Sequence, residues 1–377
     1  MTPKPYYPLF IFTVLTCFLM IGCQDDSNLA TVIQGYDESS KSETIPRLHA
    51  DFIKLSDEVS IDLVYNVYIV NEQLVVSTNR GVYCFDMEGN YIREISCKGR
   101  ADNEWLTIGP LTVDYDNGTL KIYDTSSRKV LQYTVEGEFL GSYPIPDRLF
   151  TIHQAESLSE NRTVFAHGIF KDSGIIYSLE DSTQKVISSF KTKVSTRGTV
   201  ERIGKHPLSV FEDEIKVVFP FDNKVYNIKD NQLSPCYIIN TGKKLLTGEK
   251  LKQINDFSFN EYLVESEKGY FVGPNNVFEN KTHILLSFFD ISFILIEKQS
   301  GEVTCFNSGA GKQLENLPPI GLLNTSADYF VGVVDILKAQ SLAANIPNNC
   351  QDDALLRIKA ISTAPIDSNP VIVLYRY

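Results

Sequence analysis

Two stretches, GVYCFDMEGNYIREI (81–95) and KVLQYTVEGEFLGSY (129–143), decide the fold because they repeat one pattern. In each, a strand of alternating apolar residues runs into a Glu-Gly turn, and a second alternating strand then opens with an aromatic residue. The same hairpin therefore recurs about 48 residues later, and repeats of this length with four strands each are typical of β-propeller blades. The two stretches predict an all-β repeat protein.

Further units of the same kind follow along the chain. The first unit covers residues 52–96 and the second 106–143, where Asn117-Gly118 is a strong hairpin signal because both positions tolerate positive φ. We expect six blades of about 55 residues each, although five or seven would also fit the pattern. The weaker units are assigned to 150–190, 208–239, 269–306 and a last one around 329–344.

Three segments complete the predicted architecture. Residues 245–266 carry apolar residues at helical spacing, which predicts a small helical insertion, and 329–344 begins as a strand and ends as a helix. The stretch PVIVLYRY (370–377) reads as a strand, and such a strand usually completes a propeller blade because an open ring leaves unpaired sheet edges. The predicted fold is an all-β, six-bladed β-propeller with a small helical insertion and a short C-terminal helix.

Composition and charge exclude one class of partner. The 377 residues are 43% hydrophobic and 22% charged, as in ordinary folded proteins, and the net charge is −12. Nucleic acid is bound through phosphates by clustered Lys and Arg, so an acidic chain is not expected to bind it.

The N-terminus carries an export pattern. Lys4 precedes an apolar run at 9–21, which at 13 residues is shorter than the ~20 that span a bilayer and fits a secretory signal. The run ends in Met-Ile-Gly-Cys (20–23), which resembles a bacterial lipobox and predicts lipidation of Cys23. The alternative is a short buried helix with a chance cysteine. The predicted partner at this end is a membrane, reached through an N-terminal lipid anchor.

These features divide the chain into three parts. Residues 1–22 are predicted to be a lipoprotein signal peptide, 23–46 a flexible polar tether, and 47–377 a single six-bladed domain. The acidic sequence QDDSN (24–28) resembles a surface-export signal of lipoproteins in Bacteroidetes-type bacteria. We therefore expect an outer-membrane lipoprotein that faces the periplasm or the cell surface.

The cysteines of the predicted domain are expected to be free thiols. Their number is odd and they lack a CxxC spacing. Cys84 and Cys97 lie on successive strands, but a turn at Glu88-Gly89 sets Cys84 opposite about Ile92, so a bridge to Cys97 would be strained. The five are Cys84, Cys97, Cys236, Cys305 and Cys350.

The sequence resembles a known group of proteins. FDMEGNYIREISCKGRADNEW (85–105), LTVDYDNGTLKIYDTSSRKVLQYTVEGEFLGSYPIP (111–146) and the ending NPVIVLYRY (369–377) are similar to phrases in six-bladed β-propeller lipoproteins of Bacteroides-type bacteria, whose blades are NHL-like. The resemblance implies fold and location rather than an activity. It departs at 101–103, where Ala-Asp-Asn replaces the group's usual Gly-Pro-Gly and removes positive-φ freedom from the loop.

One loop holds the candidate ligand-binding residues Arg100, Glu104 and Trp105. Trp105 is the only Trp in the chain, and an aromatic face flanked by charged groups suits a sugar or a peptide. In the alternative interpretation, Trp105 packs between blades and Arg100 pairs with Glu104.

Other candidate chemistry is sparse. Asp114, Asp116 and Asn117 lack the later carboxylate of a calcium loop, so turn formation explains them better. The sequence shows no nucleophile elbow, P-loop or dinucleotide motif. We therefore predict no catalytic residue, no metal and no cofactor; the histidines are isolated at positions 49, 153, 167, 206 and 283.

Two hypotheses of function remain open. The favoured one is a non-catalytic, lipid-anchored binding protein for a glycan, a peptide or a partner protein. The alternative is a hydrolase or lyase with its site at the mouth of the central channel, where converging carboxylates would be expected.

Overall fold

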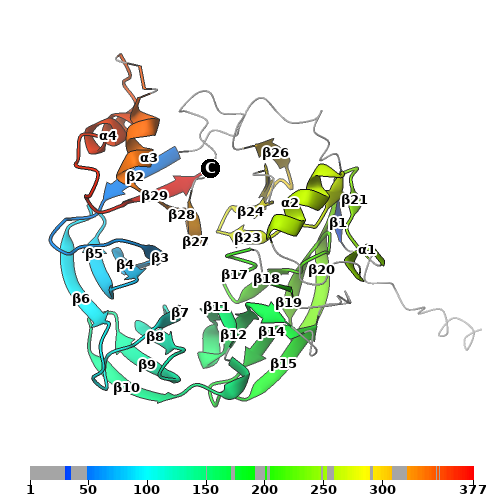
Figure 1. The fold of residues 1–377 in the computed structure, drawn as a ribbon, viewed down its shortest axis with the longest axis horizontal. Coiled ribbons are helices and arrows are strands. Elements are labelled where there is room, and N and C mark those ends of the chain that lie inside the picture. Colours follow the sequence, from blue (N-terminus) through cyan, green and yellow to red (C-terminus); the bar gives the residue numbers. More distant parts are fainter. Residues whose placement is uncertain are drawn as a thin grey trace, which may run out of the picture.

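The described chain forms six twisted sheets arranged as the blades of a closed ring (Figure 1). In this computed structural model, strand order within each sheet follows the sequence in five blades and is broken in the sixth. The described residues are 30–34, 49–149, 151–170, 175–191, 200–201, 204–247, 249–252, 259–288, 292–307, 321–344, 346–347 and 349–377. The predicted fold class and the number of blades are confirmed.

The strands of the first three blades are short and antiparallel. Blade 1 contains β3 (Val64–Val70), β4 (Gln73–Thr78), β5 (Gly81–Asp86) and β6 (Tyr91–Cys97). Blade 2 contains β7 (Ile108–Asp114), β8 (Thr119–Asp124), β9 (Lys129–Thr134) and β10 (Phe139–Pro144). Blade 3 contains β11 (Ile152–Ser157), β12 (Thr163–His167), β14 (Ile175–Glu180) and β15 (Val186–Lys191).

The other three blades complete the ring. Blade 4 contains β17 (Leu208–Phe211), β18 (Glu214–Val218), β19 (Lys224–Lys229) and β20 (Gln232–Asn240). Blade 5 contains β23 (Asn276–Glu279), β24 (His283–Ser287), β25 (Ser292–Glu297) and β26 (Val303–Asn307). Blade 6 contains β27 (Leu322–Thr325), β28 (Phe330–Val334), β29 (Val371–Arg376) and β2 (His49–Lys54).

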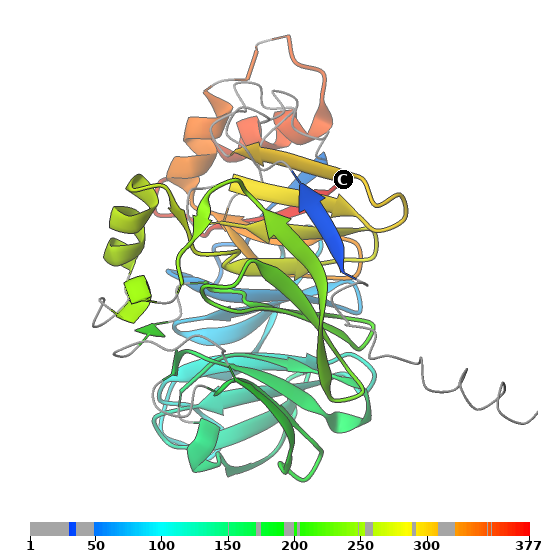
Figure 2. The ribbon, with the colours of Figure 1, turned by 90° about the vertical axis from the view of Figure 1, so that its right-hand side faces the viewer.

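Short elements lie in the connections within and between the blades. The strand pairs β13 (Ile169–Phe170) with β16 (Val200–Glu201), and β21 (Lys244–Leu245) with β22 (Tyr270–Phe271), form two small sheets. The helices are α1 (Glu249–Lys252), α2 (Phe259–Glu267), α3 (Ile336–Ala343) and α4 (Asp353–Ile361), and 3-10 turns occupy Asp147–Leu149 and Ser159–Asn161. Figure 2 shows α2 projecting from one face of the ring and α3 and α4 lying beyond blade 6.

The two hairpins that reveal the repeat have the same backbone. Gly89 and Gly137 occupy their turns with φ of 90° and 92°, a conformation that strongly favours glycine. In the first hairpin, the Asp86 carboxylate accepts hydrogen bonds from the backbone N–H groups of Glu88 (3.0 Å) and Asn90 (2.8 Å). A side chain at position 89 would also collide with the Lys54 carbonyl, so the turn packs closely on blade 6.

The ring closes inside blade 6, as predicted for 370–377. β29 lies between β28 and β2, with Val373 opposite both Gly332 and Phe52. The side chains from Val371 to Tyr375 are at most 2% exposed. The blade is therefore built from segments more than 300 residues apart, and the C-terminal strand is paired on both sides.

Asn369 ties the two sides of this closure together. Its Oδ1 accepts a hydrogen bond from the Ile61 N–H (2.8 Å), and its Nδ2 donates to the Ser56 and Val59 carbonyls (2.6 Å each). Its own N–H donates to the Asp57 carboxylate (2.7 Å). One buried amide thus satisfies backbone groups of the loop that leads into blade 1.

A strand occurs within the predicted tether. β1 (Thr31–Gln34) pairs in parallel with the outer strand of blade 4, with Ile33 opposite Ile239. Ile33 is buried among apolar residues of blades 4 and 5, and this burial explains why a short segment in a polar stretch orders here. Residues 1–29, with Cys23, and 35–48 lie outside the described residues.

The predicted helices are confirmed, and one helix was not predicted. α1 and α2 form within 245–267, and α3 follows β28 as expected. α4 is new: its N-cap is Asp352, whose carboxylate accepts from the Ala354 and Leu355 N–H groups, and it packs on the core of blade 6 through Leu355 and Ile358. No helix in the described part of the chain is both long and apolar enough to cross a membrane.

The cysteine prediction is also confirmed. Cys84 lies opposite Arg93, and Cys97 lies opposite Gly81, at the other end of the same strand pair. All five cysteines of the domain are free thiols.

Candidate functional site

A cavity of about 510 Å³ opens where the first strands of all six blades end. It is lined by residues near the C-terminal ends of β3, β7, β11, β17, β23 and β27, or in the turns that follow. Because these strands are the innermost of their blades (Figure 1), the cavity lies at one mouth of the central channel. Ligand pockets of closed β-structures such as β-barrels commonly lie at such a mouth.

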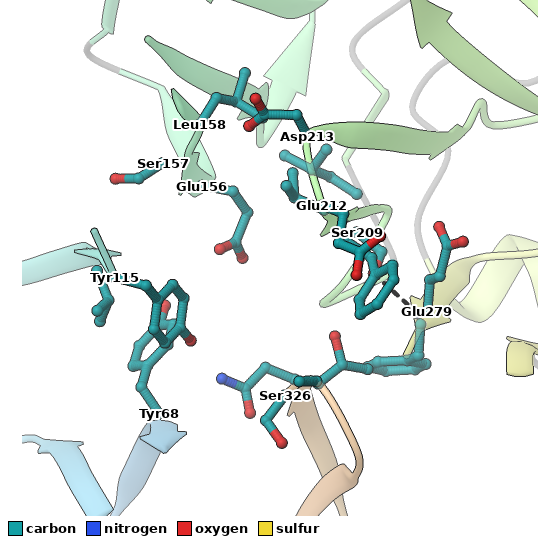
Figure 3. A pocket seen from close by; sticks show the side chains of 18 of the residues that line it. Tyr68, Tyr115, Glu156, Ser157, Leu158, Ser209, Glu212, Asp213, Glu279 and Ser326 are labelled. Atoms are coloured by element: carbon teal, nitrogen blue, oxygen red, sulfur yellow. Dashed lines mark hydrogen bonds between the residues drawn. The ribbon is translucent and has the colours of Figure 1, made fainter. Parts of the chain in front are cut away.

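Two tyrosines and a glutamate form the centre of the cavity. Tyr68 and Tyr115 lie on one side, and the Glu156 carboxylate points into the open space (Figure 3). Tyr68 is fixed because its hydroxyl donates to the Leu111 carbonyl (2.6 Å), which also ties blade 1 to blade 2. Tyr115 is 54% exposed and stands at the rim. The cavity therefore offers one anchored ring and one accessible ring.

Glu156 has an unusual ionisation. Its Oε1 accepts a hydrogen bond from Gln154 Nε2 (3.0 Å), which favours the charged form. Burial in the channel acts in the opposite direction and is stronger, so the pKa of Glu156 rises to about 7. The carboxyl is thus about half-ionised near neutral pH, where small changes in its surroundings alter its charge.

Other acidic residues at the cavity are already engaged. The Asp114 carboxylate accepts from the backbone N–H groups of Asp116 and Asn117 (3.1 Å each), as the turn interpretation predicted. Asp213 accepts from the Ser159 N–H (2.7 Å) and hydroxyl. These carboxylates form hydrogen bonds within the loops around the cavity. Their role is therefore to hold the shape of its mouth and not to bind a ligand.

A buried ion cluster closes one side of the cavity. Glu279 is fully buried, and its two oxygens lie 3.0 Å from Lys216 Nζ and 2.8 Å from Lys298 Nζ. Neither oxygen completes a hydrogen bond of good geometry, so the pairing is chiefly charge attraction. Burial alone would lower the pKa of Lys216, but Glu279 and Glu214 raise it overall. The cluster therefore remains charged and links blades 4 and 5.

His206 enters the cavity wall as a neutral side chain. Burial, together with the nearby positive charges of His153 and Lys205, lowers its pKa to about 3. Its ring lies 5.3 Å from that of Phe278. Among the described residues, no group of three or more His, Cys, Asp and Glu side chains is arranged to hold a metal ion.

The predicted loop residues lie away from this cavity. Trp105 is 1% exposed and packs between blades 1 and 2, as the packing alternative requires. Glu104 does not use Arg100 as its partner in the described contacts; its Oε2 accepts from the Ala101 N–H (2.8 Å) and so holds the loop. Arg100 is exposed. Ligand binding by Arg100 and Glu104 stays a prediction, but a buried Trp105 ring offers no face to a ligand.

Sequence reasoning missed the residues of the cavity. Glu156, Gln154 and Asn324 stand near the ends of innermost strands, and they come from blades 3 and 6. The available signal was a polar side chain at a strand position that should face the core. Without the strand boundaries of these weaker repeats, that signal could not be recognised.

The ring and its cavity define a six-bladed β-propeller with a candidate site at the channel mouth. Residues 53–376 match a family described as "Domain of unknown function (DUF4934)", and the chain belongs to that family. None of the curated proteins matches the sequence at a significant level.

Two solved structures from Bacteroides are similar to this chain to different degrees. A crystal structure of a "Putative exported protein" from Bacteroides fragilis NCTC 9343 is 17% identical, with a TM-score of 0.72 over 92% of this chain and 99% of that chain. A member of the duf4221 family from Bacteroides vulgatus is 9% identical, with a TM-score of 0.49 over 88% and 98%. The first likeness shows a common propeller fold; lipidation and NHL-like blades stay predictions.

Proposed function

We propose that this protein binds a ligand at the mouth of its propeller channel without transforming it. The observation that supports the proposal is the cavity itself, to which the innermost strand of every blade contributes. It combines aromatic rings, buried amides and a carboxylate, the mixture that ligand pockets use for affinity and orientation. The ligand would be a glycan, a peptide or a segment of a partner protein.

The binding experiment uses residues 24–377, which retain β1, in a glycan and peptide screen. Ser326 follows β27 and lines the cavity, so Ser326→Trp should fill it and weaken every channel ligand at least about tenfold. Ser182→Trp, on the exposed turn between β14 and β15, is the matched control and should bind normally. A ligand that binds equally to wild type and to folded Ser326→Trp would place binding elsewhere and refute the proposal.

We further propose that the protein is anchored in the cell envelope through lipid on Cys23. The lipobox-like sequence before Cys23 supports this, as does the description of the Bacteroides fragilis protein as exported. Three acyl chains at ~0.8 kcal/mol per buried methylene would hold the protein stably. Cys23→Ala should abolish labelling by palmitate in cells, whereas Cys17→Ala should retain it. Undiminished labelling of Cys23→Ala would contradict lipidation.

A second candidate function is a hydrolase or lyase at the same site. Glu156, with its pKa near 7, has the ionisation that suits a general acid or base, and several carboxylates converge on the cavity. The two functions differ in the fate of the ligand. Recovery of an unchanged ligand after prolonged incubation supports binding; conversion by wild type but not by Glu156→Gln supports catalysis.

A further inference from the structure

We propose that the group received by this cavity is an organic cation, an alkylammonium or guanidinium group such as the end of a lysine or arginine side chain. The inference rests on the proposed function and specifies its ligand. Three side chains carry it: Glu156 and Gln154 on β11, and Asn324 on β27.

The charge of the lining is the first argument. Of the charged side chains that line the cavity, all are acidic, and no Lys or Arg belongs to the described lining. Among the described residues, the hydrogen bond that Glu156 accepts comes from a neutral amide, and no cation forms an ion pair with it. Two acidic lining residues have cationic partners outside the lining: Glu279 pairs with Lys216 and Lys298, and Asp213 lies 3.7 Å from Arg162. The acidic lining residues are Asp114, Asp116, Glu156, Glu212, Asp213 and Glu279.

Unsatisfied buried amides are the second, independent argument. Asn324 is 7% exposed, and neither its Oδ1 nor its Nδ2 has a partner in the described part of the chain. Gln154 is 9% exposed; its Nε2 donates to Glu156 and to the Leu208 carbonyl (2.8 Å), and its Oε1 is left without a partner. Buried polar groups in native proteins are normally satisfied, so these atoms favour a ligand that completes them.

The chemistry of these atoms selects the ligand. The Glu156 carboxylate and the amide oxygens of Gln154 and Asn324 are acceptors, and ammonium and guanidinium groups supply only donors. The Asn324 Nδ2 group is a donor, so its partner would be an acceptor elsewhere in the ligand, such as a peptide carbonyl. β11 and β27 belong to opposite blades, and their polar side chains line the same cavity, so a ligand in it is exposed to acceptors from both sides of the ring. Tyr68 and Tyr115 stand beside Glu156 and offer rings against which a cation is attracted (Figure 3). A neutral sugar would leave the carboxylate uncompensated, and an anion would be repelled.

The test compares two probes of nearly the same shape, of which one is a cation and the other is neutral with a carbonyl oxygen in place of one donor group. N-acetyl-arginine amide and its neutral isostere N-acetyl-citrulline amide are titrated calorimetrically into residues 24–377, which retain β1, at pH 8. We expect the arginine probe to bind at least about tenfold more tightly. Glu156→Gln should remove most of that difference, and Asn324→Leu should weaken the arginine probe at least about fivefold. Glu138→Gln, an identical change on an exposed turn of blade 2, should have no effect.

The pH dependence identifies the carboxylate. Because Glu156 has a pKa of about 7, raising the pH from 6 to 8 increases its ionised fraction, and affinity for the arginine probe should rise up to about tenfold. His206 is already neutral over this range. Glu156→Gln should show no such rise. The other titratable groups around Glu156 are Tyr68, Tyr115, Asp114, Asp116, Glu212, Asp213 and Glu279.

A third probe, agmatine, distinguishes the sources of the cation. Tighter binding of a blocked Gly-Arg-Gly peptide than of agmatine supports a side chain within a peptide, and the reverse order supports a free amine; either result supports the cation site. Equal binding of the arginine and citrulline probes, or unchanged binding by folded Glu156→Gln, overturns it. The proposed binding function would still stand after such a result if another ligand binds wild type but not Ser326→Trp. Failure of the cation site can therefore be distinguished from failure of the binding function. Thermal unfolding confirms that each variant is folded.

Discussion

A variant that lacks residues 371–377 is expected to lose the cooperatively folded ring. β29 lies in the middle of blade 6, and its removal takes the hydrogen-bonding partner from both β28 and β2. Burial of its five apolar side chains, which pack on both faces of the blade, contributes roughly 8–15 kcal/mol as an upper estimate. That is comparable with the whole stability of a typical domain, about 5–15 kcal/mol.

Urea unfolding followed by tryptophan fluorescence measures this effect. Trp105 is the only tryptophan and is buried between blades 1 and 2, so its emission reports on the ring far from the deletion. Arg376→Ala is the matched control at the end of the same strand. Its ion pair with Asp51 (3.2 Å) is half-exposed, and its loss should cost less than about 1 kcal/mol. A cooperative transition near the wild-type midpoint in the deletion variant would show that β29 is dispensable.

Glu279→Ala should be the most damaging single substitution at the site. It removes the shared partner of two lysines, of which the Lys216 side chain is 5% exposed. Leaving one partner of a buried ion pair unpaired typically costs about 3–5 kcal/mol. Glu214 cannot replace Glu279, because its side chain is 61% exposed and screened by solvent. The free energy of unfolding in urea measures the loss.

The double variant Lys216→Met, Glu279→Leu separates charge from packing. Removing both partners together leaves no buried ammonium at Lys216, so the double variant should recover to within about 1–2 kcal/mol of wild type. Glu214→Ala is the control and should change stability by less than about 1 kcal/mol. A double variant as unstable as Glu279→Ala alone would mean that packing, and not the stranded charge, causes the loss.

The architecture could be predicted because it depends on patterns within short stretches of the sequence. Gly89 and Gly137 recur in equivalent turns, and the alternation on either side of them fixes which side chains face the core. The closing strand could be predicted because its apolar run is bounded by Asn369-Pro370. α4 escaped prediction because it is a two-turn helix with only Leu355 and Ile358 buried, too short a pattern to recognise.

The mouth of the channel was named in the alternative hypothesis, but the residues of the candidate site could not be predicted, because they come together only once the ring has closed. Two blades lie between Glu156 and Asn324 in the chain, and both residues line one cavity only through the circular arrangement. The prediction instead selected Trp105 because it is the only Trp in the sequence, but its large ring is packed between blades 1 and 2. An uncommon residue type signals importance without saying whether that importance is structural.

Closure through blade 6 also changes how the protein should come apart. An open array of repeats can fray from its terminal repeats, since each of these has a single neighbour. In this ring every blade has two neighbours, and β2 gains its partner only when a segment more than 300 residues away in sequence docks beside it. Closing so long a loop costs conformational entropy before the contacts between β2 and β29 can form. We therefore expect the ring to assemble slowly. Once closed, the ring has no weak end at which local opening, and attack by a protease, can begin.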